Sequence, residues 1–321
     1  MHKVIVYGLG KEYQTQKFIL EREYEIVGLS DKNTDLKRDY KLFIEPDKIK
    51  RKNWDYIYVT SSKYYDEIVV ELRDKYGIQE ERIVGTRQAW WNITNYEARQ
   101  GWIIRQLEQI PSGSKILDAG AGNQRYKAFC SHLKYVSQDF GKYDDGAISE
   151  GIHGAEKWKS KECDIVSDII QIPVEDQSFD AILCSEVIEH LKNPVLAIRE
   201  FSRILRNDGI LILTAPFCSL THMAPFYYSN GFSKYWYLDN LKEAGFEIIS
   251  IEHNGNYFSY LAQELMRVGQ MSQQYNGPAI TEKEYDSLFN VLKTIKNQSL
   301  QSEGTEECLC FGMFVKARKN I

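Results

Sequence analysis

Short apolar runs alternate with amphipathic stretches along most of the chain, and this alternation restricts it to an α/β fold. The first series has strands predicted at residues 3–7, 24–30, 54–60 and 82–84, with helices at residues 11–22 and 64–76. Strands that are joined through helices pair in parallel and connect by right-handed crossovers. The series stops near residue 88, so we expect residues 1–88 to form a small α/β domain.

A second, longer series follows a predicted helix at residues 96–109. Its strands are predicted at residues 115–119, 135–138, 165–166, 179–184, 210–214, 246–251 and 309–316. An amphipathic helix at residues 194–205 separates the fourth and fifth strands, and Gly209 is expected to end it. Five α/β repeats followed by two closing strands predict a seven-stranded doubly wound sheet.

The same rhythm sets the predicted domain boundaries. Residues 89–113 are predicted to form a linker helix, and residues 114–321 the larger second domain. Residues from about 266 to 304 do not follow the α/β rhythm, so we predict a helical insertion there, before the last strand. The predicted fold is therefore α/β, with the seven-stranded sheet preceded by a smaller α/β domain.

The first strand of the second series ends in an acid that precedes two alternate glycines: Asp118, Gly120 and Gly122. In open α/β sheets, ligands bind beyond the carboxyl ends of the strands, and glycines there let the backbone approach the ligand. An acid ahead of the glycines would repel a pyrophosphate. It would instead accept a charge-assisted hydrogen bond from a cationic amino group.

Further acids follow the next strands of this series. Asp139 ends the second strand, about 20 residues on, where a carboxylate can bind both hydroxyls of a ribose. Asp168 and Ile169 follow the third strand, and together they offer one acceptor and one apolar side chain to an adenine ring. The fourth strand leads into the segment E-V-I-E-H at residues 186–190.

Together these residues resemble the class I S-adenosylmethionine (SAM)-dependent methyltransferases, and closely the branch with an E-V-x-E-H segment after the fourth strand. The resemblance covers roughly residues 98–316 and implies SAM as the cofactor. It also implies a role for each motif. Asp118, Gly120 and Gly122 would contact the methionine half of SAM, and Asp139 would bind the ribose. Asp168 and Ile169 would contact the adenine, and Glu186 and Val187 would border the reacting end. The chain departs from the family at Gln124, where a third glycine is common.

Methyl transfer needs a general base only where the acceptor must lose a proton, as a sugar hydroxyl does. Two histidines follow strands at the expected edge of the sheet. We prefer His222 as the base, because the loop after the fifth strand usually covers the acceptor pocket in this fold; a hydrogen-bonded role within that loop is the alternative. For His190, packing and capping at a helix start is favoured over catalysis.

An aromatic cluster after His222 suits a sugar or another flat, partly polar acceptor. Its members are Phe226, Tyr227, Tyr228, Phe232, Tyr235, Trp236 and Tyr237, and half of them could instead form the core of a helix at residues 233–244. The segment around it resembles bacterial methyltransferases of uncharacterised or glycan-modifying type. We therefore predict O-methylation of a small-molecule or sugar acceptor in bacterial surface-glycan or related biosynthesis. The alternative is a SAM- or nucleotide-binding regulatory or scaffold protein without turnover.

The first series carries a second glycine turn, Gly8-Leu9-Gly10, followed by Asp31. This pattern is typical of a dinucleotide site, but Tyr13 occupies the third glycine position and would crowd a bound pyrophosphate. The segment resembles small Rossmann-like domains found beside sugar-modifying enzymes. Nucleotide binding and a scaffold role both stay open, and an oxidoreductase has only this turn in its favour.

The bulk properties exclude several other classes. A net charge of -5 does not fit a nucleic-acid binder, and no run of residues is long and apolar enough to span a bilayer. The six cysteines are scattered, so we expect free thiols and a cytoplasmic protein. No Cys or His pairing completes a zinc site, and no metal is predicted.

Overall fold

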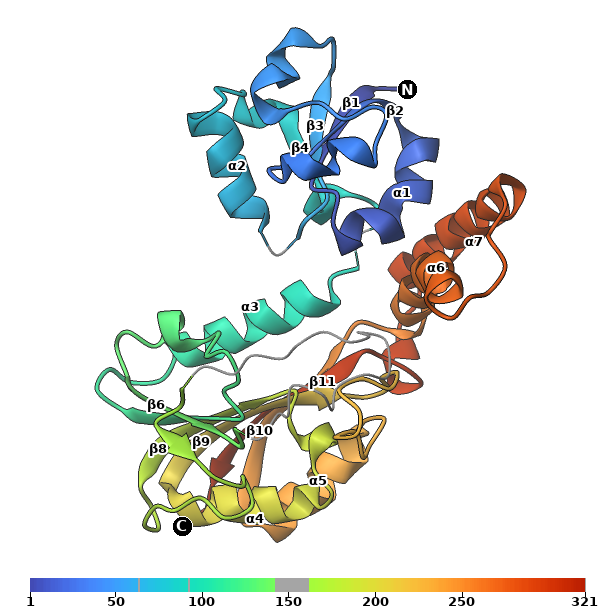
Figure 1. The fold of residues 1–321 in the computed structure, drawn as a ribbon. Coiled ribbons are helices and arrows are strands. Elements are labelled where there is room, and N and C mark those ends of the chain that lie inside the picture. The colour runs from blue at the N-terminus through green and yellow to red at the C-terminus, as the bar shows by residue number, and fades with distance from the viewer. Residues whose placement is uncertain (63, 92, 142–161, 321) are drawn as a thin grey trace. The chain divides into compact units, whose positions relative to one another are not determined.

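The computed structural model describes residues 1–62, 64–91, 93–141 and 162–320 (Figure 1). The chain divides into two compact units. The first unit is Met1–Thr94 with Phe258–Ser302, and the second is Asn95–Tyr257 with Glu303–Ile321. Each unit has its own sheet.

The first unit contains a four-stranded parallel sheet in the order β2-β1-β3-β4. Its strands are Lys3–Tyr7 (β1), Glu25–Ser30 (β2), Tyr56–Val59 (β3) and Ile83–Gly85 (β4), and its first two helices are Lys11–Glu23 (α1) and Tyr65–Asp74 (α2). Successive residues of a strand face opposite sides. Val4 and Val6 thus share a buried cluster with residues of α1, whereas Ile5 and Tyr7 share one with residues of α2. All six elements lie within a few residues of their predicted positions.

Two further helices belong to this unit, Tyr257–Gln274 (α6) and Glu282–Gln301 (α7). Their buried residues Ala262, Phe289 and Leu292 pack in the same cluster as residues of β1 and α1. We predicted a helical insertion at about residues 266–304 within the second domain. The helices are present and begin earlier, but they pack with the first unit, because their apolar faces meet the side of α1.

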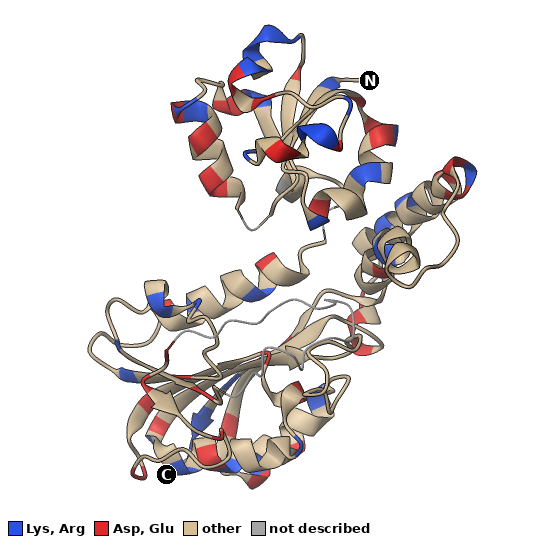
Figure 2. Cartoon of the chain, viewed as in Figure 1, with Lys and Arg blue, Asp and Glu red and all other residues tan. Residues whose placement is uncertain are grey.

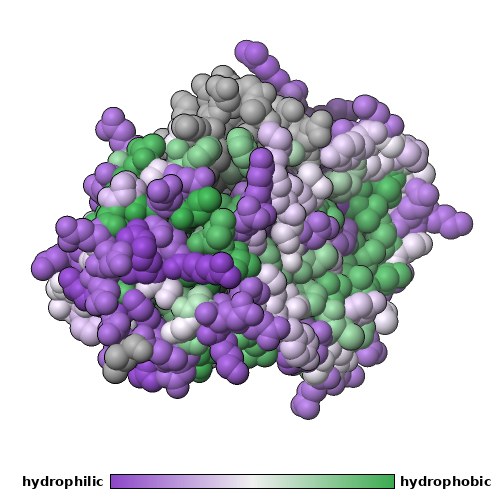
Figure 3. Space-filling view, turned by 90° about the horizontal axis from the view of Figure 1, so that it is seen from below, coloured by the Kyte–Doolittle hydropathy of each residue, from purple (hydrophilic) through white to green (hydrophobic). Residues whose placement is uncertain are grey.

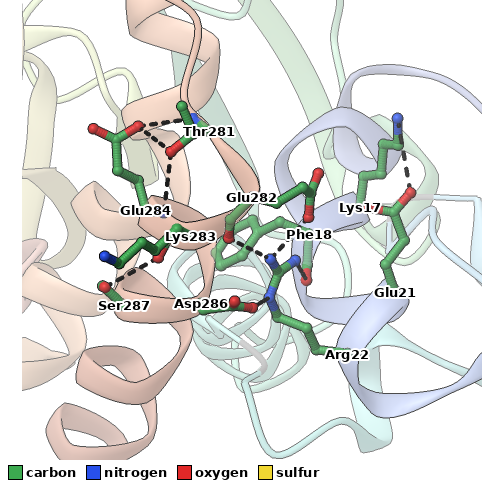
Figure 4. Close-up of polar contacts among 10 residues, drawn as sticks. All are labelled: Lys17, Phe18, Glu21, Arg22, Thr281, Glu282, Lys283, Glu284, Asp286 and Ser287. Atoms are coloured by element: carbon green, nitrogen blue, oxygen red, sulfur yellow. Dashed lines mark hydrogen bonds and ion pairs between the residues drawn. The ribbon is translucent and has the colours of Figure 1, made fainter.

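Arg22 near the end of α1 connects this helix to α7 (Figure 4). Its guanidinium binds the carboxylates of Glu282 and Asp286 at 3.0 and 2.9 Å. It also donates to the carbonyl oxygens of Phe18 and Glu282. Phe18 stacks on Tyr285 at a ring-centroid distance of 5.1 Å, so polar and aromatic contacts join the same two helices.

The second unit contains a mixed seven-stranded sheet in the order β10-β11-β9-β8-β5-β6-β7. Its strands are Lys115–Ala119 (β5), Lys134–Asp139 (β6), Ile165–Val166 (β7), Phe179–Ser185 (β8), Leu205–Pro216 (β9), Phe246–Asn254 (β10) and Gly312–Lys319 (β11). Within this described sheet, β11 alone points opposite to the other strands. The prediction of seven strands is confirmed.

Helices cover both faces of this sheet (Figure 1). Asn95–Glu108 (α3) packs on one face, in a cluster with Ile116 and Leu183, and Pro194–Ile204 (α4) and Lys234–Glu243 (α5) pack on the other, in a cluster with Leu117. Short 3₁₀ helices lie at Thr34–Arg38, Pro46–Arg51, Glu80–Arg82, Thr86–Gln88, Lys127–Phe129, Ile188–His190 and Thr305–Glu307.

Gly209 does not end a helix, and this expectation was wrong. Helix α4 ends at Ile204, and Gly209 lies inside β9, after Asp208 with a φ of 62°. The β8–β9 pairing shifts register here: Phe179 pairs with Leu205, whereas Ala181 pairs with Ile210. Gly209 therefore lies at an irregularity within β9 and not at a helix end.

Charged residues of both signs are mixed over both units (Figure 2). The face shown in Figure 3 mixes hydrophilic side chains with hydrophobic areas between them. Among the described residues, no helix combines the length and the apolar character needed to cross a membrane. All six cysteines lie in the described residues and none forms a disulfide, as predicted.

Candidate active site

A cavity of about 800 Å³ opens in the second unit, where β5, β6 and β8 end. The chain runs outward from β5 in both directions, through β6 to β7 and through β8 to β9, so this is a topological switch point of the sheet. All ten residues predicted for the cofactor and for catalysis line this one cavity: Asp118, Gly120, Gly122, Asp139, Asp168, Ile169, Glu186, Val187, His190 and His222.

The turn after β5 has room only for a glycine at its first position. Gly120 has a φ of +77°, and a Cβ built on it would lie 2.4 Å from Cγ2 of Val187. Its N–H donates to the backbone carbonyl of Gln138 at 2.9 Å, and that of Ala121 donates to the same oxygen at 2.8 Å. The turn is thus fixed between β6 and the loop after β8.

Asp139 holds the glycine turn from the end of β6. Its Oδ2 accepts the N–H of Gly122 at 2.9 Å, and its Oδ1 accepts the N–H of Gly141 at 3.0 Å. Each carboxylate oxygen can accept a further hydrogen bond. Asp139 can therefore support the turn and bind a ligand hydroxyl in the same cavity.

Asp118, the acid ahead of the two glycines, is buried, with 3% of its surface exposed. Burial raises the pKa of its carboxyl to about 6, and the charge of Asp139 adds to the rise, whereas the hydrogen bond from Tyr135 lowers the pKa. The Tyr135 hydroxyl donates to Oδ2 at 2.5 Å. A cationic group entering the cavity would stabilise the ionised form of this acid.

Glu186 is fixed by two residues that the sequence patterns did not single out. Arg99 on α3 forms an ion pair with its Oε2 at 2.8 Å, and the Thr214 hydroxyl donates to its Oε1 at 3.1 Å. Glu186 itself has a φ of 56°, unusual for a residue with a side chain. Arg99 and its neighbour Tyr96 line the cavity.

The loops after β8 and β9 bring the two predicted histidines together. The rings of His190 and His222 lie 4.8 Å apart at an interplanar angle of 80°. Burial and, to a smaller extent, the neighbouring His222 lower the pKa of His190 to about 4, so the ring is neutral at neutral pH. Beside them, burial and the charge of Glu186 raise the pKa of the fully buried Glu189 well above its usual range.

Comparisons with known proteins match one segment in each of the two units. Residues 1–84 match the family described as C2185-like, N-terminal, and residues 117–213 match the family described as Methyltransferase domain. A protein of Mycobacterium tuberculosis named as a probable S-adenosylmethionine-dependent methyltransferase is 28% identical over 129 residues, which are 39% of this chain and 44% of that protein. The second unit therefore contains a SAM-dependent methyltransferase domain.

Two further comparisons also give methyltransferases. A tRNA (carboxymethyluridine(34)-5-O)-methyltransferase of Arabidopsis thaliana is 30% identical over 111 residues, which are 34% of this chain and 25% of that protein. The solved structure of a SAM-dependent methyltransferase from Archaeoglobus fulgidus is 14% identical with a TM-score of 0.43, and the match covers 70% of this chain and 94% of that one. The chain spans less than half the length of each curated relative that it matches.

The residues of this methyltransferase domain fit SAM. The cavity combines a buried acid for the ammonium group, Asp118, with Asp139 for the ribose. Ile169 is 5% exposed and offers an apolar side chain for the adenine, while Asp168 uses one oxygen to accept the N–H of Ile170 at 3.1 Å. SAM is the cofactor that this domain requires, and these assignments of single residues stay predictions.

The aromatic cluster of the methyltransferase domain is split between the cavity and the hydrophobic core, and the sequence had left both positions open. Phe226 and Tyr228 line the cavity. Phe232 and Tyr237 lie in the hydrophobic core beneath α4 and α5, and Trp236 packs against them. Tyr235 is 63% exposed. Two of the seven rings are thus placed to meet a ligand in this cavity.

The predicted second site, Gly8, Gly10 and Asp31, lies at the end of β1 in the first unit. Asp31 accepts the N–H of Leu9 at 2.8 Å and that of Asn33, so its carboxylate already serves the backbone. Tyr13 is 2% exposed in the core of that unit. These contacts support the scaffold interpretation of this turn.

Proposed function

We propose that this chain is an enzyme that moves the methyl group of SAM to a hydroxyl group of a small-molecule or sugar acceptor, in bacterial surface-glycan or related biosynthesis. One observation carries the proposal. A single cavity is lined both by the glycine turn with its acids Asp118 and Asp139 and by the paired histidines His190 and His222. Cofactor residues and candidate proton acceptors thus share one space.

SAM, when bound, supplies a methyl group that its sulfonium already activates. The protein has to hold the acceptor in line with that group, and such positioning can supply a large part of the rate enhancement. We assign Asp118 to the ammonium group and Asp139 to the ribose hydroxyls. Val187 packs over Gly120 and closes the turn from the side of the reacting end.

The acceptor hydroxyl must lose its proton as its oxygen forms the new bond. We assign His222 to promote this loss, with His190 beside it. The Nδ1 of His222 lies 2.9 Å from the carbonyl oxygen of Leu220, which fixes the ring. A carbonyl can only accept, so Nδ1 carries the proton and Nε2 carries the lone pair.

The lining supports an acceptor that is flat and partly polar. Phe226 and Tyr228 add aromatic surface to the same cavity as the two histidines. Aromatic faces with polar neighbours suit sugar rings. A tRNA acceptor is the second candidate, favoured by the Arabidopsis relative; the net charge of -5 counts against it.

A screen for release of S-adenosylhomocysteine tests the proposal, with nucleotide sugars, free glycans and bulk tRNA as acceptors. We expect turnover with a sugar acceptor. His222→Ala should lower kcat at least roughly 100-fold and leave SAM affinity within about twofold. Unchanged turnover in this variant would contradict the role of His222. Binding of SAM in calorimetry with no acceptor consumed would favour the regulatory or scaffold alternative.

A further inference from the structure

Three potential metal ligands meet in the methyltransferase domain: Glu189, His190 and His222. Their candidate ligand atoms all lie within 4.8 Å of one another. Glu189 and His190 come from the 3₁₀ helix Ile188–His190 after β8, and His222 comes from the loop after β9. Two loops at the carboxyl edge of the sheet thus converge on one point.

Glu189 is the unusual member of this group. Its side chain is fully buried, and neither carboxylate oxygen has a hydrogen-bond partner among the described residues. The Nε2 of His190 lies 3.7 Å from Oε1, and Arg99 is engaged by Glu186. A buried carboxylate costs several kcal/mol unless a partner compensates it. A cation between the carboxylate and the two rings would be such a partner.

The histidine rings are held as metal-binding histidines are. The Nδ1 of His190 lies 2.5 Å from the carbonyl oxygen of Phe226, and that of His222 lies 2.9 Å from the carbonyl oxygen of Leu220. Each Nδ1 therefore carries the proton, and each Nε2 presents a lone pair. An Nδ1–H bound to a backbone carbonyl is the usual outer contact of an imidazole that binds a metal through Nε2.

We propose that Glu189, His190 and His222 bind one divalent first-row transition-metal cation beside the acceptor position. Two imidazoles and one carboxylate suit Zn²⁺, Mn²⁺, Fe²⁺ or Co²⁺ better than Mg²⁺ or Ca²⁺, which prefer oxygen ligands alone. Metal–ligand bonds of about 2.0–2.2 Å require the three side chains to draw in by roughly 1 Å. The sequence patterns predicted no metal, because these residues do not form a recognised ligand spacing.

The metal site would add a step to the proposed function, and its catalytic role rests on that function being correct. Three protein ligands leave a position open to a hydroxyl oxygen in the cavity, as in catalytic metal sites. Coordination lowers the pKa of such a hydroxyl, and its proton passes to solvent. The oxygen electron pair then forms the C–O bond while the S–C bond electrons stay on sulfur. His222 promotes proton loss through the cation in this arrangement.

Cobalt provides a test that is independent of turnover. The full chain is treated with a chelator, dialysed and titrated with Co²⁺, and the visible absorption of the bound ion is recorded. We expect one equivalent to bind, with affinity lowered at least roughly 10- to 100-fold in Glu189→Gln and in His222→Ala. His253→Ala is the matched control and should bind Co²⁺ like the wild type. His253 lies 3.9 Å from the carboxylate of Glu307, and the described residues add no third ligand to this pair.

Calorimetry with S-adenosylhomocysteine on the same samples separates the two proposals. Retained cofactor binding with lost Co²⁺ binding in the ligand variants supports the metal site and shows that they are folded. Failure of the wild type to bind one equivalent of Co²⁺, or equal Co²⁺ binding by all variants, overturns the metal site and leaves the methyltransferase proposal standing. Co²⁺ binding at the site without cofactor binding would instead contradict the proposed function.

Discussion

The two units each end an internal parallel strand in a glycine turn, and the turns are built alike. Gly8 after β1 and Gly120 after β5 both have positive φ, of 93° and 77°. In both turns an acid at the end of the next strand accepts a backbone N–H: Asp31 from Leu9 at 2.8 Å, and Asp139 from Gly122 at 2.9 Å. The glycines and the following acid are therefore a way of closing the strand end, and they do not by themselves define a ligand.

The turns differ in what precedes and follows them. The residue two positions before the first glycine is buried in both units, but it is Val6 in the first unit and Asp118 in the second. Helix α1 begins directly after the first turn, with Tyr13 in the core, whereas the second turn continues irregularly until Lys127–Phe129 and opens into the cavity. A charge ahead of the glycines and space behind them distinguish the cofactor site from the scaffold turn.

Replacing one glycine in each turn should show the largest difference. Gly120→Ala places a Cβ 2.4 Å from Val187 at a φ of +77°, so we expect about 1–3 kcal/mol less unfolding free energy and at least roughly 100-fold weaker SAM binding. Gly10→Ala meets no atom within 4 Å and should change the unfolding free energy by no more than about 1 kcal/mol. Denaturant unfolding and calorimetry measure both. Wild-type SAM affinity in Gly120→Ala would mean that SAM binds elsewhere.

Removing the charge from each acid gives the next largest contrast. Asp118→Asn keeps an acceptor for the Tyr135 hydroxyl but loses the charge assigned to the ammonium group. A charge-assisted hydrogen bond is worth about 1.5–3 kcal/mol, so SAM affinity should fall roughly 10- to 100-fold. Asp31→Asn in the first unit is the matched control and should leave SAM affinity unchanged. Equal affinities for both variants would remove Asp118 from the binding site.

The sequence was sufficient where the determinants are local. Strand positions and the two glycine turns follow from hydrophobic patterns and backbone freedom, and the shared edge of Asp118, Asp139 and Asp168 follows from the parallel connection of their strands. Both histidines were placed near the site for the same reason. Hydrophobic periodicity and strand order were thus enough to predict most of the sheet and most of the residues that line the cavity.

Contacts between distant segments could not be predicted in this way. Arg99 pairs with Glu186 across 87 residues, and the helix that carries it was predicted only as a linker. The pair α6 and α7 was recognised as helical, but an apolar helix face does not specify which core it joins. No sequence pattern reveals that Glu189 is buried without a hydrogen-bond partner among the described residues.

The pH dependence of SAM binding should show the smallest effect and sharpen the role of Asp118. Burial raises the pKa of this carboxyl to about 6, above its ordinary value near 3.8. The ammonium group binds the ionised form, so SAM affinity should fall about tenfold from pH 7 to pH 5. The folded protein holds this proton more tightly than the unfolded chain, so the same group adds stability as the pH falls from about 6 towards 4, against the trend in affinity.

Asp118→Asn separates these two trends from the titration of other groups. The variant has no carboxyl at this position, so its SAM affinity should vary with pH less steeply than that of the wild type. The wild type should also gain stability relative to the variant as the pH is lowered through about 6, because only the wild type takes up the proton. Parallel pH profiles for the two proteins, in binding and in unfolding, would show that the acid ahead of the glycines is not the charge that distinguishes the second turn from the first.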